Sequence, residues 1–359
     1  MLLDHARMLI LGLGVSGEAA AVLGASRNAP VTVTDTRSRD DLAPALARPA
    51  PLPISYHLGS PPPGLDGFTL LVRSPGVPCD LPVLVEAHRR GVPVWSEIEF
   101  GAILCPHPIT AVTGTNSKST TTALIGELMR AADHTAYVAG NIGYPLTAAF
   151  TGMPTDGDAD AVAVVEVSAG QLEDCHAFKP HIAVLTNVRP EHMDRYTWDE
   201  YVAAKSKIVR NHTPADITVA NFDDEWCRQI AERSPGRTVF FSALGPLPDD
   251  TDGVFVDGSD AVAHHDDARI VLWAREELRV PGALPNLLAM AAAGLADGIA
   301  AAVIRDVAVA YTGREHVIEH VATVAAVDYV NDSKATNPWS IAARPGQFRR
   351  PARGADHRR

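Results

Sequence analysis

The chain has 359 residues, of which 46% are hydrophobic and 21% charged, and its formal net charge is −12. At about 100–200 residues per domain, this length predicts two or three domains, and the composition excludes a disordered chain. The acidic balance argues against a general nucleic-acid-binding protein. The four cysteines are far apart in the sequence, which excludes a disulfide framework or zinc knuckle and is typical of a reducing cytoplasm.

The first hundred residues alternate apolar runs with helical segments. Strands are predicted at 8–12, 31–35, 68–72 and 92–95, with helices from about residue 18 and over 82–90. Strands that alternate with helices predict an open parallel sheet. The N-terminus lacks the basic segment of a signal peptide, so none is expected.

A second α/β unit is predicted after a linker at 105–108. We expect a strand at 109–112, a polar loop at 114–120, a helix at 121–132, and strands at 161–167, 181–186 and near 219–224. The strands at 161–167 and 181–186 are continuously apolar, as in a sheet covered on both faces. A β-rich patch over 238–280 and Ala-rich helices to about 310 follow, and 327–330 is predicted to start a third α/β unit. The apolar stretch 283–304 is interrupted by proline and polar residues, which favours buried helices over a membrane span.

The segment GTNSKST at 114–120 is the strongest local signal for a ligand. A strand, a glycine-containing polar loop and a helix that starts at Lys-Ser-Thr form an anion site, because backbone N–H groups and the helix dipole face the phosphates. Lys118 adds a positive charge, and a hydroxyl can reach Mg²⁺. The alternative is a helix cap without a ligand. The loop consists of Gly114, Thr115, Asn116, Ser117, Lys118, Ser119 and Thr120.

A second phosphate signal lies at the N-terminus. Gly12, Gly14 and Gly17 have the GxGxxG spacing, and Asp35 ends the next strand, as in dinucleotide-binding units. This context favours a nucleotide diphosphate over a purely structural turn, but it does not say which nucleotide.

Polar side chains follow other predicted strands. Glu166 ends one strand, and His192 and Asp194 follow the next. Because strand carboxyl ends converge in parallel sheets, these groups could hold Mg²⁺ beside a triphosphate, although each alone could be a loop cap or surface ion pair. Lys205 by itself would be a solvated surface lysine on an amphipathic helix. The histidines and aspartates at 264–267 are predicted to form an exposed polar turn rather than a metal site.

Taken in order along nearly the whole chain, these motifs resemble the Mur ligases, the ATP-dependent amide ligases of peptidoglycan synthesis. They are LGLGVSG (11–17), TDTR (34–37), SPGV (74–77), GTNSKST (114–120), GNIGYP (140–145), EVSAGQLE (166–173), HMDRY (192–196), the lysine of AAK (203–205) and NDSKATN (331–337). The motif GTN-x-KST alone is also compatible with folylpolyglutamate synthases. HMDRY together with NDSKATN points to the branch that adds D-glutamate.

The resemblance implies an N-terminal Rossmann-like domain (1–104) for the UDP-substrate, a central P-loop-type α/β ATPase domain (105–309) and an incomplete C-terminal α/β domain (310–359) for the amino acid. It implies ATP and Mg²⁺ as cofactors. The small-molecule substrates would be UDP-N-acetylmuramoyl-L-alanine and D-glutamate. A cytoplasmic monomer without nucleic-acid or membrane partners is expected.

The resemblance also implies residue roles. The UDP part would contact Val15, Ser16, Asp35, Thr36, Arg37, Ser74 and Gly76, and the muramoyl part would lie near Asn141 and Ser168. Mg²⁺ would be held by Ser119, Glu166, His192 and a carbamate of Lys205, and catalysis would rest on Lys118, Glu166, His192 and Lys205. Lys334 and Thr336 would receive D-glutamate, whose carboxylates a cation suits.

The implied mechanism begins with phosphoryl transfer from ATP to the terminal carboxylate of L-alanine. The acyl phosphate supplies a good leaving group, and the amine of D-glutamate then displaces phosphate to form an amide. The protein would contribute positioning and charge neutralisation.

Some positions depart from the resemblance. Ser117 stands where the family usually has glycine, so crowding of the phosphates or backbone strain is expected there. Gly170 stands where the family usually has an aromatic residue. Asn286 is the candidate for the adenine contact, because the usual His-Asn pair is absent.

Two alternatives stay open. The glycine turn and Asp35 alone would suit an NAD-dependent oxidoreductase, although that function leaves GTNSKST and HMDRY unexplained. The arginine-rich, aperiodic stretch from 344 to 359 suggests a truncated or frameshifted third domain, which would otherwise continue for on the order of 100 residues. The chain could then be a non-catalytic protein that binds nucleotide or UDP-substrate.

Overall fold

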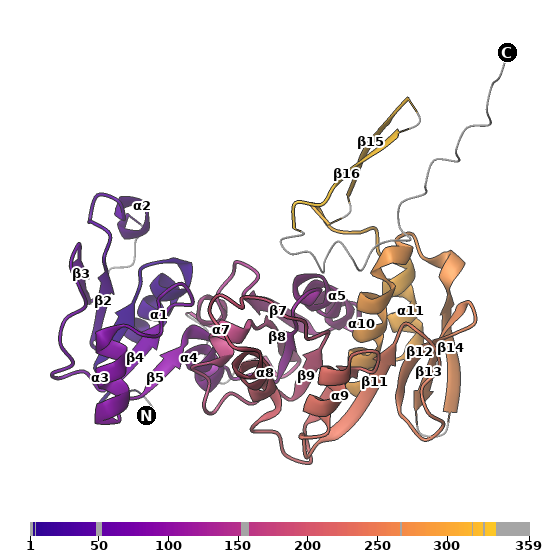
Figure 1. The fold of residues 1–359 in the computed structure, drawn as a ribbon, viewed down its shortest axis with the longest axis horizontal. Coiled ribbons are helices and arrows are strands. Elements are labelled where there is room, and N and C mark those ends of the chain that lie inside the picture. The colour runs from indigo at the N-terminus through magenta and orange to yellow at the C-terminus, as the bar shows by residue number, and fades with distance from the viewer. Residues whose placement is uncertain are drawn as a thin grey trace.

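Two α/β sheets follow one another along the long axis of the molecule, and a separate hairpin comes after them (Figure 1). The computed structural model describes residues 3, 5–47, 52–151, 158–265, 268–317, 319–325 and 327–334. Thr336 and the arginine-rich stretch therefore lie outside the described residues. No helix in this part of the chain is long and apolar enough to cross a membrane.

The first sheet has five parallel strands in the order β3-β2-β1-β4-β5. They are β1 (Met8–Leu11), β2 (Val31–Asp35), β3 (Ile54–Leu58), β4 (Leu70–Arg73) and β5 (Val94–Ser96). Helices α1 (Val15–Ser26) and α4 (Glu97–Leu104) pack on one face and α3 (Pro82–Arg90) on the other, while the short α2 (Ala43–Leu46) lies between β2 and β3. This order brings the carboxyl ends of β2, β1 and β4 together.

The second sheet has nine strands in the order β14-β13-β12-β11-β10-β9-β6-β8-β7, parallel from β7 to β12 and antiparallel beyond. They are β6 (Ile109–Thr113), β7 (Thr135–Gly140), β8 (Ala161–Glu166), β9 (Ile182–Leu185), β10 (Ile217–Asn221), β11 (Arg237–Ser242), β12 (Gly253–Asp257), β13 (Asp260–His265) and β14 (Ala268–Ala274). The predicted burial on both faces is confirmed, since every residue of β6, β8 and β9 is buried.

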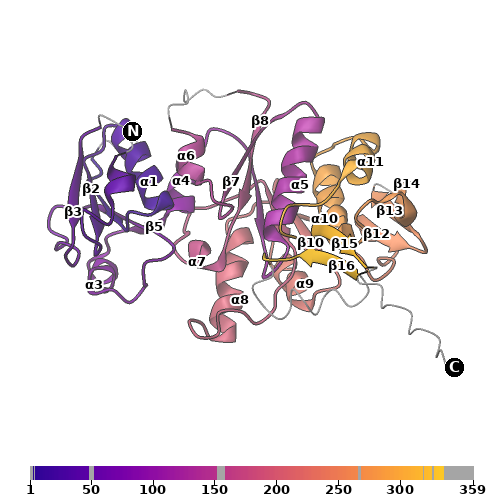
Figure 2. The ribbon, with the colours of Figure 1, turned by 90° about the horizontal axis from the view of Figure 1, so that it is seen from above.

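Helices cover both faces of this second sheet (Figure 2). One side carries α5 (Lys118–Ala131), α10 (Leu284–Ala296) and α11 (Ala301–Ala310). The other carries α6 (Leu146–Ala149), α7 (Ala169–Leu172), α8 (Trp198–Ser206) and α9 (Glu225–Ala231). Short 3-10 turns lie at Lys207–Val209, Arg275–Glu277 and Pro281–Ala283. The Ala-rich stretch thus forms helices, as expected from the sequence. Most of α10 is buried, whereas α11 buries only Ile304 and Ala308.

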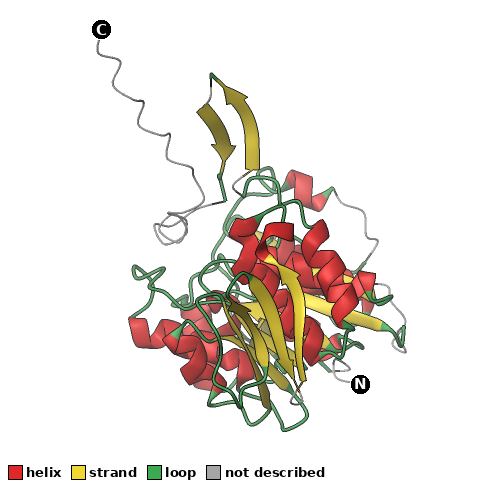
Figure 3. Cartoon of the chain, turned by 90° about the vertical axis from the view of Figure 1, so that its right-hand side faces the viewer, coloured by secondary structure: helices red, strands yellow, loops and turns green. Residues whose placement is uncertain are grey.

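The hairpin of β15 (Glu319–Val324) and β16 (Val327–Asn331) projects beyond the second sheet (Figure 3). The predicted strand at 327–330 is confirmed, but it pairs antiparallel with β15 instead of joining a parallel sheet. Antiparallel pairing needs only a short turn, whereas a parallel pair needs a long crossover.

Several boundaries differ from the prediction. The helix expected from residue 121 begins at Lys118, so the end of the polar loop is its first turn. His264 and His265 lie in β13 itself rather than in a turn, and 266–267 are outside the described residues. The strands β3 and β7 and the short helices α6 and α7 were not predicted from the sequence. A four-residue helix such as α6 or α7 is too short to show periodicity.

Candidate active site at the strand carboxyl ends

The phosphate loop lies where three neighbouring strands end. Its strand, β6, pairs with β8 on one side and with β9 on the other. Val112 of β6 is in register with Glu166, the last residue of β8. The predicted convergence of the loop and Glu166 is therefore confirmed, as the strand-end rule for parallel sheets requires.

Gly114 lets this loop pass closely against the end of β9. A Cβ at residue 114 would lie 1.9 Å from Thr186 Oγ1, a distance that no side chain can occupy. Beyond it, Asn116 N donates to Asn187 Oδ1 at 2.9 Å, and Thr186 Oγ1 donates to Asn116 O at 2.7 Å. The loop is thus tied to the segment after β9 through its backbone.

Ser117 adopts the left-handed conformation, with φ of 72° at the N-cap of α5. The strain expected at this serine is confirmed, because a residue with a Cβ is disfavoured there. Its side chain makes no capping bond to α5. The first N–H groups of α5 thus have no serine cap and suit an anion.

Lys118 folds back over the loop. Its Nζ donates to Gly114 O at 2.9 Å and to Thr115 O at 2.8 Å. Burial lowers the pKa of Lys118, and nearby Glu166 and Glu191 oppose this shift. The ammonium is therefore held above the loop, where phosphate oxygens would supply further negative charge.

Lys205 is buried, and the interpretation as a solvated surface lysine is wrong. Its side chain is among the largest fully buried ones, because α8 packs against the phosphate loop. The amine Nζ donates to Gly114 O at 2.8 Å and lies 4.7 Å from the centre of the Tyr201 ring. Burial first, and then the charge of Lys118, lower the pKa of Lys205 well below its usual value. The amine is thus shifted towards its neutral, nucleophilic form.

Glu166 offers a carboxylate oxygen to the site. Its Oε1 accepts a bond of 2.9 Å from Asn141 Nδ2, whereas its buried Oε2 has no hydrogen-bond partner in the described part of the chain. A buried, unpartnered carboxylate oxygen beside a phosphate loop fits a divalent cation. In the described ranges no group of three or more His, Cys, Asp or Glu could hold a metal ion, so a metal here would need other ligands as well.

His192 is exposed on the loop between β9 and α8 and has a φ of 56°. Ser119 lies in the first turn of α5. The structure therefore places Ser119 and Lys205 against the phosphate loop and Glu166 on the adjoining strand end, while His192 lies in a nearby strained loop. Strained residues of this kind often occur at functional sites.

The N-terminal glycine turn forms a second candidate site at the end of the first sheet. Asp35 Oδ2 accepts from Leu13 N at 2.8 Å, and Ser74 Oγ donates to Gly12 O at 3.1 Å. Arg37 binds both Asp35 and Leu13 O, and its hydrogen bond lowers the pKa of Asp35 to about 2. A Cβ at Gly17 would lie 1.9 Å from Gly12 O, so this glycine permits the close turn.

The other predicted residues of this site lie around the turn. Val15 and Ser16 form the first turn of α1, Thr36 follows β2 and Gly76 is exposed in the loop after β4. The first turn of α1 has no side-chain cap, which leaves its N–H groups for an anion.

Three further predicted residues occupy separate positions. Ser168 is the N-cap of α7 in a capping box with Gln171, so its hydroxyl has a structural use. Asn286 lies in the first turn of α10 and accepts from Thr121 Oγ1 of α5 at 3.4 Å. Lys334 is exposed after β16, and its backbone N–H donates to His316 O at 3.2 Å.

Tyr201 and Asn187 also lie at this site and were not predicted from the sequence. The hydroxyl of Tyr201 lies 3.2 Å from Thr115 Oγ1 and 3.4 Å from Glu191 Oε2, and burial raises its pKa to about 12. Tyr201 precedes Lys205 by one helical turn, a spacing that places both on one face. Asn187 is the second residue after β9, so the strand-end rule could have found it.

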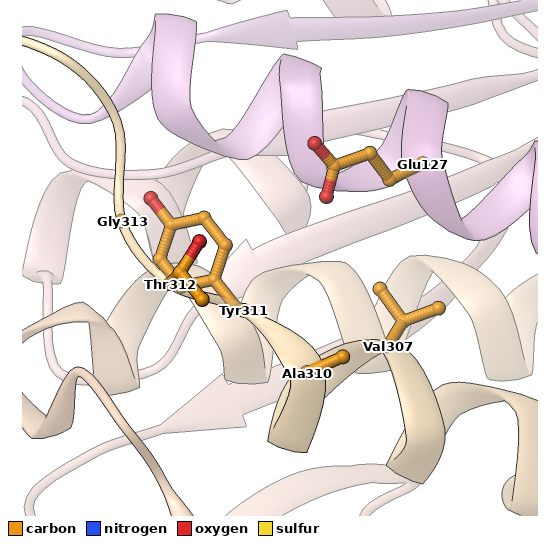
Figure 4. Close-up of a pocket in the computed structure, with 6 residues that line it drawn as sticks. All are labelled: Glu127, Val307, Ala310, Tyr311, Thr312 and Gly313. Atoms are coloured by element: carbon orange, nitrogen blue, oxygen red, sulfur yellow. The ribbon is translucent and has the colours of Figure 1, made fainter.

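A pocket of about 200 Å³ lies apart from these residues, between α5 on one side and the end of α11 with the segment after it on the other (Figure 4). It is lined by Glu127, Val307, Ala310, Tyr311, Thr312 and Gly313. Glu127 is about two turns along α5 from the end of the phosphate loop. The pocket is therefore not the predicted site.

Family comparisons match both sheets. Residues 112–278 match the Mur ligase middle domain, and residues 6–96 match the Mur ligase MurD-like N-terminal domain. A UDP-N-acetylmuramoylalanine–D-glutamate ligase of Symbiobacterium thermophilum is 38% identical over 344 residues, which cover 94% of this chain and 74% of the relative. The ligase of the same name from Koribacter versatilis is 36% identical over 338 residues, or 92% and 72%.

Solved structures agree on the fold. The UDP-N-acetylmuramate-alanine ligase of Thermotoga maritima matches with a TM-score of 0.53 at 20% identity, over 94% of this chain and 76% of the other. MurF from Acinetobacter baumannii matches with a TM-score of 0.54 at 16% identity, over 94% and 69%. The mixed α/β architecture predicted from the sequence is confirmed.

Proposed function

The chain belongs to the Mur ligase family, and we propose that it is an ADP-forming ligase that joins D-glutamate to UDP-N-acetylmuramoyl-L-alanine. The observation that supports this proposal best is the set of relatives named for this reaction at 36–38% identity. Two glycine-containing turns, each at a strand carboxyl end and before a helix without a side-chain cap, are compatible with it. The reaction belongs to the synthesis of a peptidoglycan precursor. We place the protein in the cytoplasm and infer that it acts as a monomer.

The N-terminal sheet is proposed to bind the UDP part of the substrate. The uncapped first turn of α1, with Val15 and Ser16, faces the place where a diphosphate would sit. Arg37 is half-exposed beside Asp35, so its guanidinium can add a bond to a phosphate or uracil oxygen. Thr36, Ser74 and Gly76 would complete this site, in a domain that we assign to 1–104.

The phosphate loop is proposed to bind ATP, with Lys118 and the start of α5 against the β- and γ-phosphates. Gly114, Thr115, Asn116, Ser117, Ser119 and Thr120 would provide backbone and hydroxyl contacts. Asn286 accepts a hydrogen bond from Thr121 of α5 and is the candidate for the contact with the adenine ring. This central domain is assigned to 105–309.

We further propose that Ser119, Glu166, His192 and a modified Lys205 hold Mg²⁺. The buried Oε2 of Glu166 supports a cation there. Lys205 would react as a neutral amine with CO₂, forming an N–C bond and releasing one proton, so that an anionic carbamate oxygen replaces a cation. When bound, Mg²⁺ supplies charge neutralisation at the phosphate oxygens.

The residues of the chain then serve two group transfers. The γ-phosphoryl group of ATP passes to the L-alanine carboxylate, and ADP leaves. The amine of D-glutamate attacks the acyl phosphate, phosphate leaves with the C–O bonding pair, and the amine loses one proton to water. Lys118 would stabilise the negative charge of the transferred group, while Asn141 and Ser168 would contact the acyl chain.

D-Glutamate would be received by Lys334 and Thr336 in a C-terminal domain that begins near residue 310. A lysine ammonium suits the carboxylates of this substrate. The exposed position of Lys334 after β16 is compatible with this role.

The proposal is tested by phosphate release from ATP with UDP-N-acetylmuramoyl-L-alanine and D-glutamate. We expect release only when all three are present, and none when L-glutamate replaces D-glutamate. Release that ignores the amino acid would overturn the ligase function. Calorimetric binding of ATP and UDP-substrate without any turnover would instead indicate a non-catalytic binding protein.

A further inference from the structure

Arg73, the last residue of β4, is a buried cation that the predicted site does not use. Its side chain is 2% exposed. The guanidinium is ion-paired through Nε with Asp174, and Nη2 lies 2.8 Å from Glu173 Oε2. A buried charge is stable only when it is paired and hydrogen-bonded in this way.

Arg73 joins the two sheets. It lies on the first sheet, whereas Glu173 and Asp174 directly follow α7, which packs on the second. The views in Figures 1 and 2 place α7 beside α4, between the sheets, and Ser96 N at the end of β5 also donates to Asp174 O at 3.1 Å. The ion pairs of Arg73 therefore lie at the junction of the two nucleotide-binding units.

On the first sheet, the same guanidinium fixes the loop after β4. Its Nη1 donates to Val77 O at 2.9 Å, which closes the 74–77 loop over the end of its own strand. Ser74 of this loop is bonded to the glycine turn through Gly12 O. A movement of Arg73 would therefore shift the loop that we assign to the UDP-substrate.

On the second sheet, Glu173 carries the contact onwards. Its Oε2 also pairs with Arg195 Nη2 at 2.6 Å. Arg195 and Tyr196 both donate backbone bonds to His192 O, at 2.9 and 3.0 Å. A continuous series of charge-assisted and backbone bonds thus runs from the 74–77 loop to the strained His192.

Gly170 lies beside both arginines of this series. A Cβ at residue 170 would lie 3.5 Å from Arg195 Nη1 and 3.6 Å from the Tyr196 hydroxyl, which is ordinary van der Waals contact. The carbonyl of Gly170 also accepts from Arg73 Nη2 at 3.3 Å. The glycine thereby contacts both arginines.

We propose that Arg73, through Glu173 and Arg195, is a positioning residue that couples occupancy of the 74–77 loop to the conformation of the 192–196 loop. This inference rests on the proposed function, since it assigns the first loop to the UDP-substrate and the second to the phosphoryl-transfer site. Binding of the UDP-substrate then orders the segment that carries His192 before ATP reacts.

The experiment measures hydrogen exchange of the 192–196 amides with and without saturating UDP-N-acetylmuramoyl-L-alanine. The wild type is expected to gain protection there, and Arg73→Met is expected to lose this gain. The KM for the UDP-substrate should rise about tenfold, the effect of one lost charge-assisted hydrogen bond, while the KM for ATP stays within about twofold. Arg73→Lys keeps the positive charge but lacks the planar guanidinium with its several N–H donors, so it should retain only part of the gain in protection.

Matched variants separate positioning from folding. Arg89→Met removes an exposed arginine of α3, paired within that helix to Glu86, and should change neither readout. Arg195→Met leaves the ion pair between Arg73 and Asp174 in place, so the junction between the sheets should stay folded. This variant should lose only the gain in hydrogen-exchange protection of the 192–196 amides. The double variant Arg73→Met/Arg195→Met should lose no more protection of the 192–196 amides than Arg73→Met loses by itself.

Two outcomes would count against the inference in different ways. If the wild type binds the UDP-substrate and Arg73→Met shows the same protection with only a lower melting temperature, Arg73 is structural and the coupling is wrong. If the wild type does not bind the UDP-substrate at all, the proposed function fails, and the coupling fails with it.

Discussion

At the scale of single residues, the site is built from groups held in unfavourable states. Ser117 and His192 have left-handed backbones, and Lys205 is a buried amine. Each of these states costs stability, and the packing of β6, β8, β9 and α8 around the loop offsets that cost. Residue-level substitutions can therefore stabilise the fold while impairing the site.

Ser117→Gly should raise the free energy of unfolding by about 1 kcal/mol, because glycine adopts a positive φ without steric penalty. Ser117→Ala is the matched control, since it removes the hydroxyl but keeps the Cβ and the strain. Urea unfolding compares the two. Equal stability of the glycine and alanine variants would show that strain at this residue is negligible.

On the proposed role of Lys205 as a metal ligand, Lys205→Met should lower kcat/KM by at least about 100-fold. Losing a residue that only orients a metal ligand usually costs about 10–100-fold, and loss of the ligand itself should cost more. The same change removes a buried amine, so the melting temperature should not fall. Lys179→Met, at an exposed lysine paired with Asp216, is the control. With ¹³C-bicarbonate, the wild type should show a carbamate NMR signal that Lys205→Met lacks, and a signal persisting in this variant would exclude modification at Lys205.

At the scale of elements, the phosphate loop depends on how closely β6 and β9 approach. Thr186 at the end of β9 donates to the loop carbonyl of Asn116, and Gly114 leaves room for its hydroxyl. The loop conformation is therefore set by a neighbouring strand that follows more than 60 residues later. Apolar runs alone predict the strands, but not this contact between them.

Gly114→Ala should destabilise the protein by about 1–3 kcal/mol, the usual result of forcing extra atoms into a packed site. It should also weaken ATP binding, because the loop must move. Thr186→Ala on the same chain removes the clashing oxygen and should recover part of this loss. Additive effects of the two substitutions on urea unfolding would show that the pair does not interact.

At the scale of the whole molecule, buried carboxylates join the two sheets. Glu97 at the start of α4 accepts from Thr147 N at 2.6 Å and Thr147 Oγ1 at 2.7 Å, on α6 of the second sheet. Glu99 accepts from Ala177 N at 2.6 Å and Phe178 N at 2.8 Å. Together with Arg73, these buried carboxylates connect the two sheets.

Glu97 should make this junction sensitive to pH. Burial raises its pKa from the ordinary 4.5 to about 7. A carboxyl group whose pKa is higher in the folded than in the unfolded state stabilises the folded protein when the pH is below the pKa of the unfolded state. This contribution is lost as the pH rises towards the folded-state pKa of about 7. Between pH 5 and 8, the free energy of unfolding of the wild type should therefore fall by up to about 3 kcal/mol relative to that of Glu97→Gln, whose side chain does not titrate. Urea unfolding at several pH values tests this, and parallel curves for the two proteins would contradict it.

The sequence by itself determined the features that short-range chemistry specifies. The glycine turn with Asp35, the loop from Gly114 to Thr120 and the continuously apolar strands are local patterns, and the architecture and family follow from them. The meeting of Glu166 with the phosphate loop was also predictable, because parallel strands end at one edge.

Only the tertiary structure decided which groups are buried and what they contact. Lys205 looks like a surface lysine because the helix pattern around it is ordinary, yet α8 packs it under the loop. Arg73 and Glu173 are 100 residues apart, and nothing in either local sequence indicates their ion pair. Local patterns fix backbone conformation, whereas burial and charge pairing depend on segments that meet only when the chain is folded.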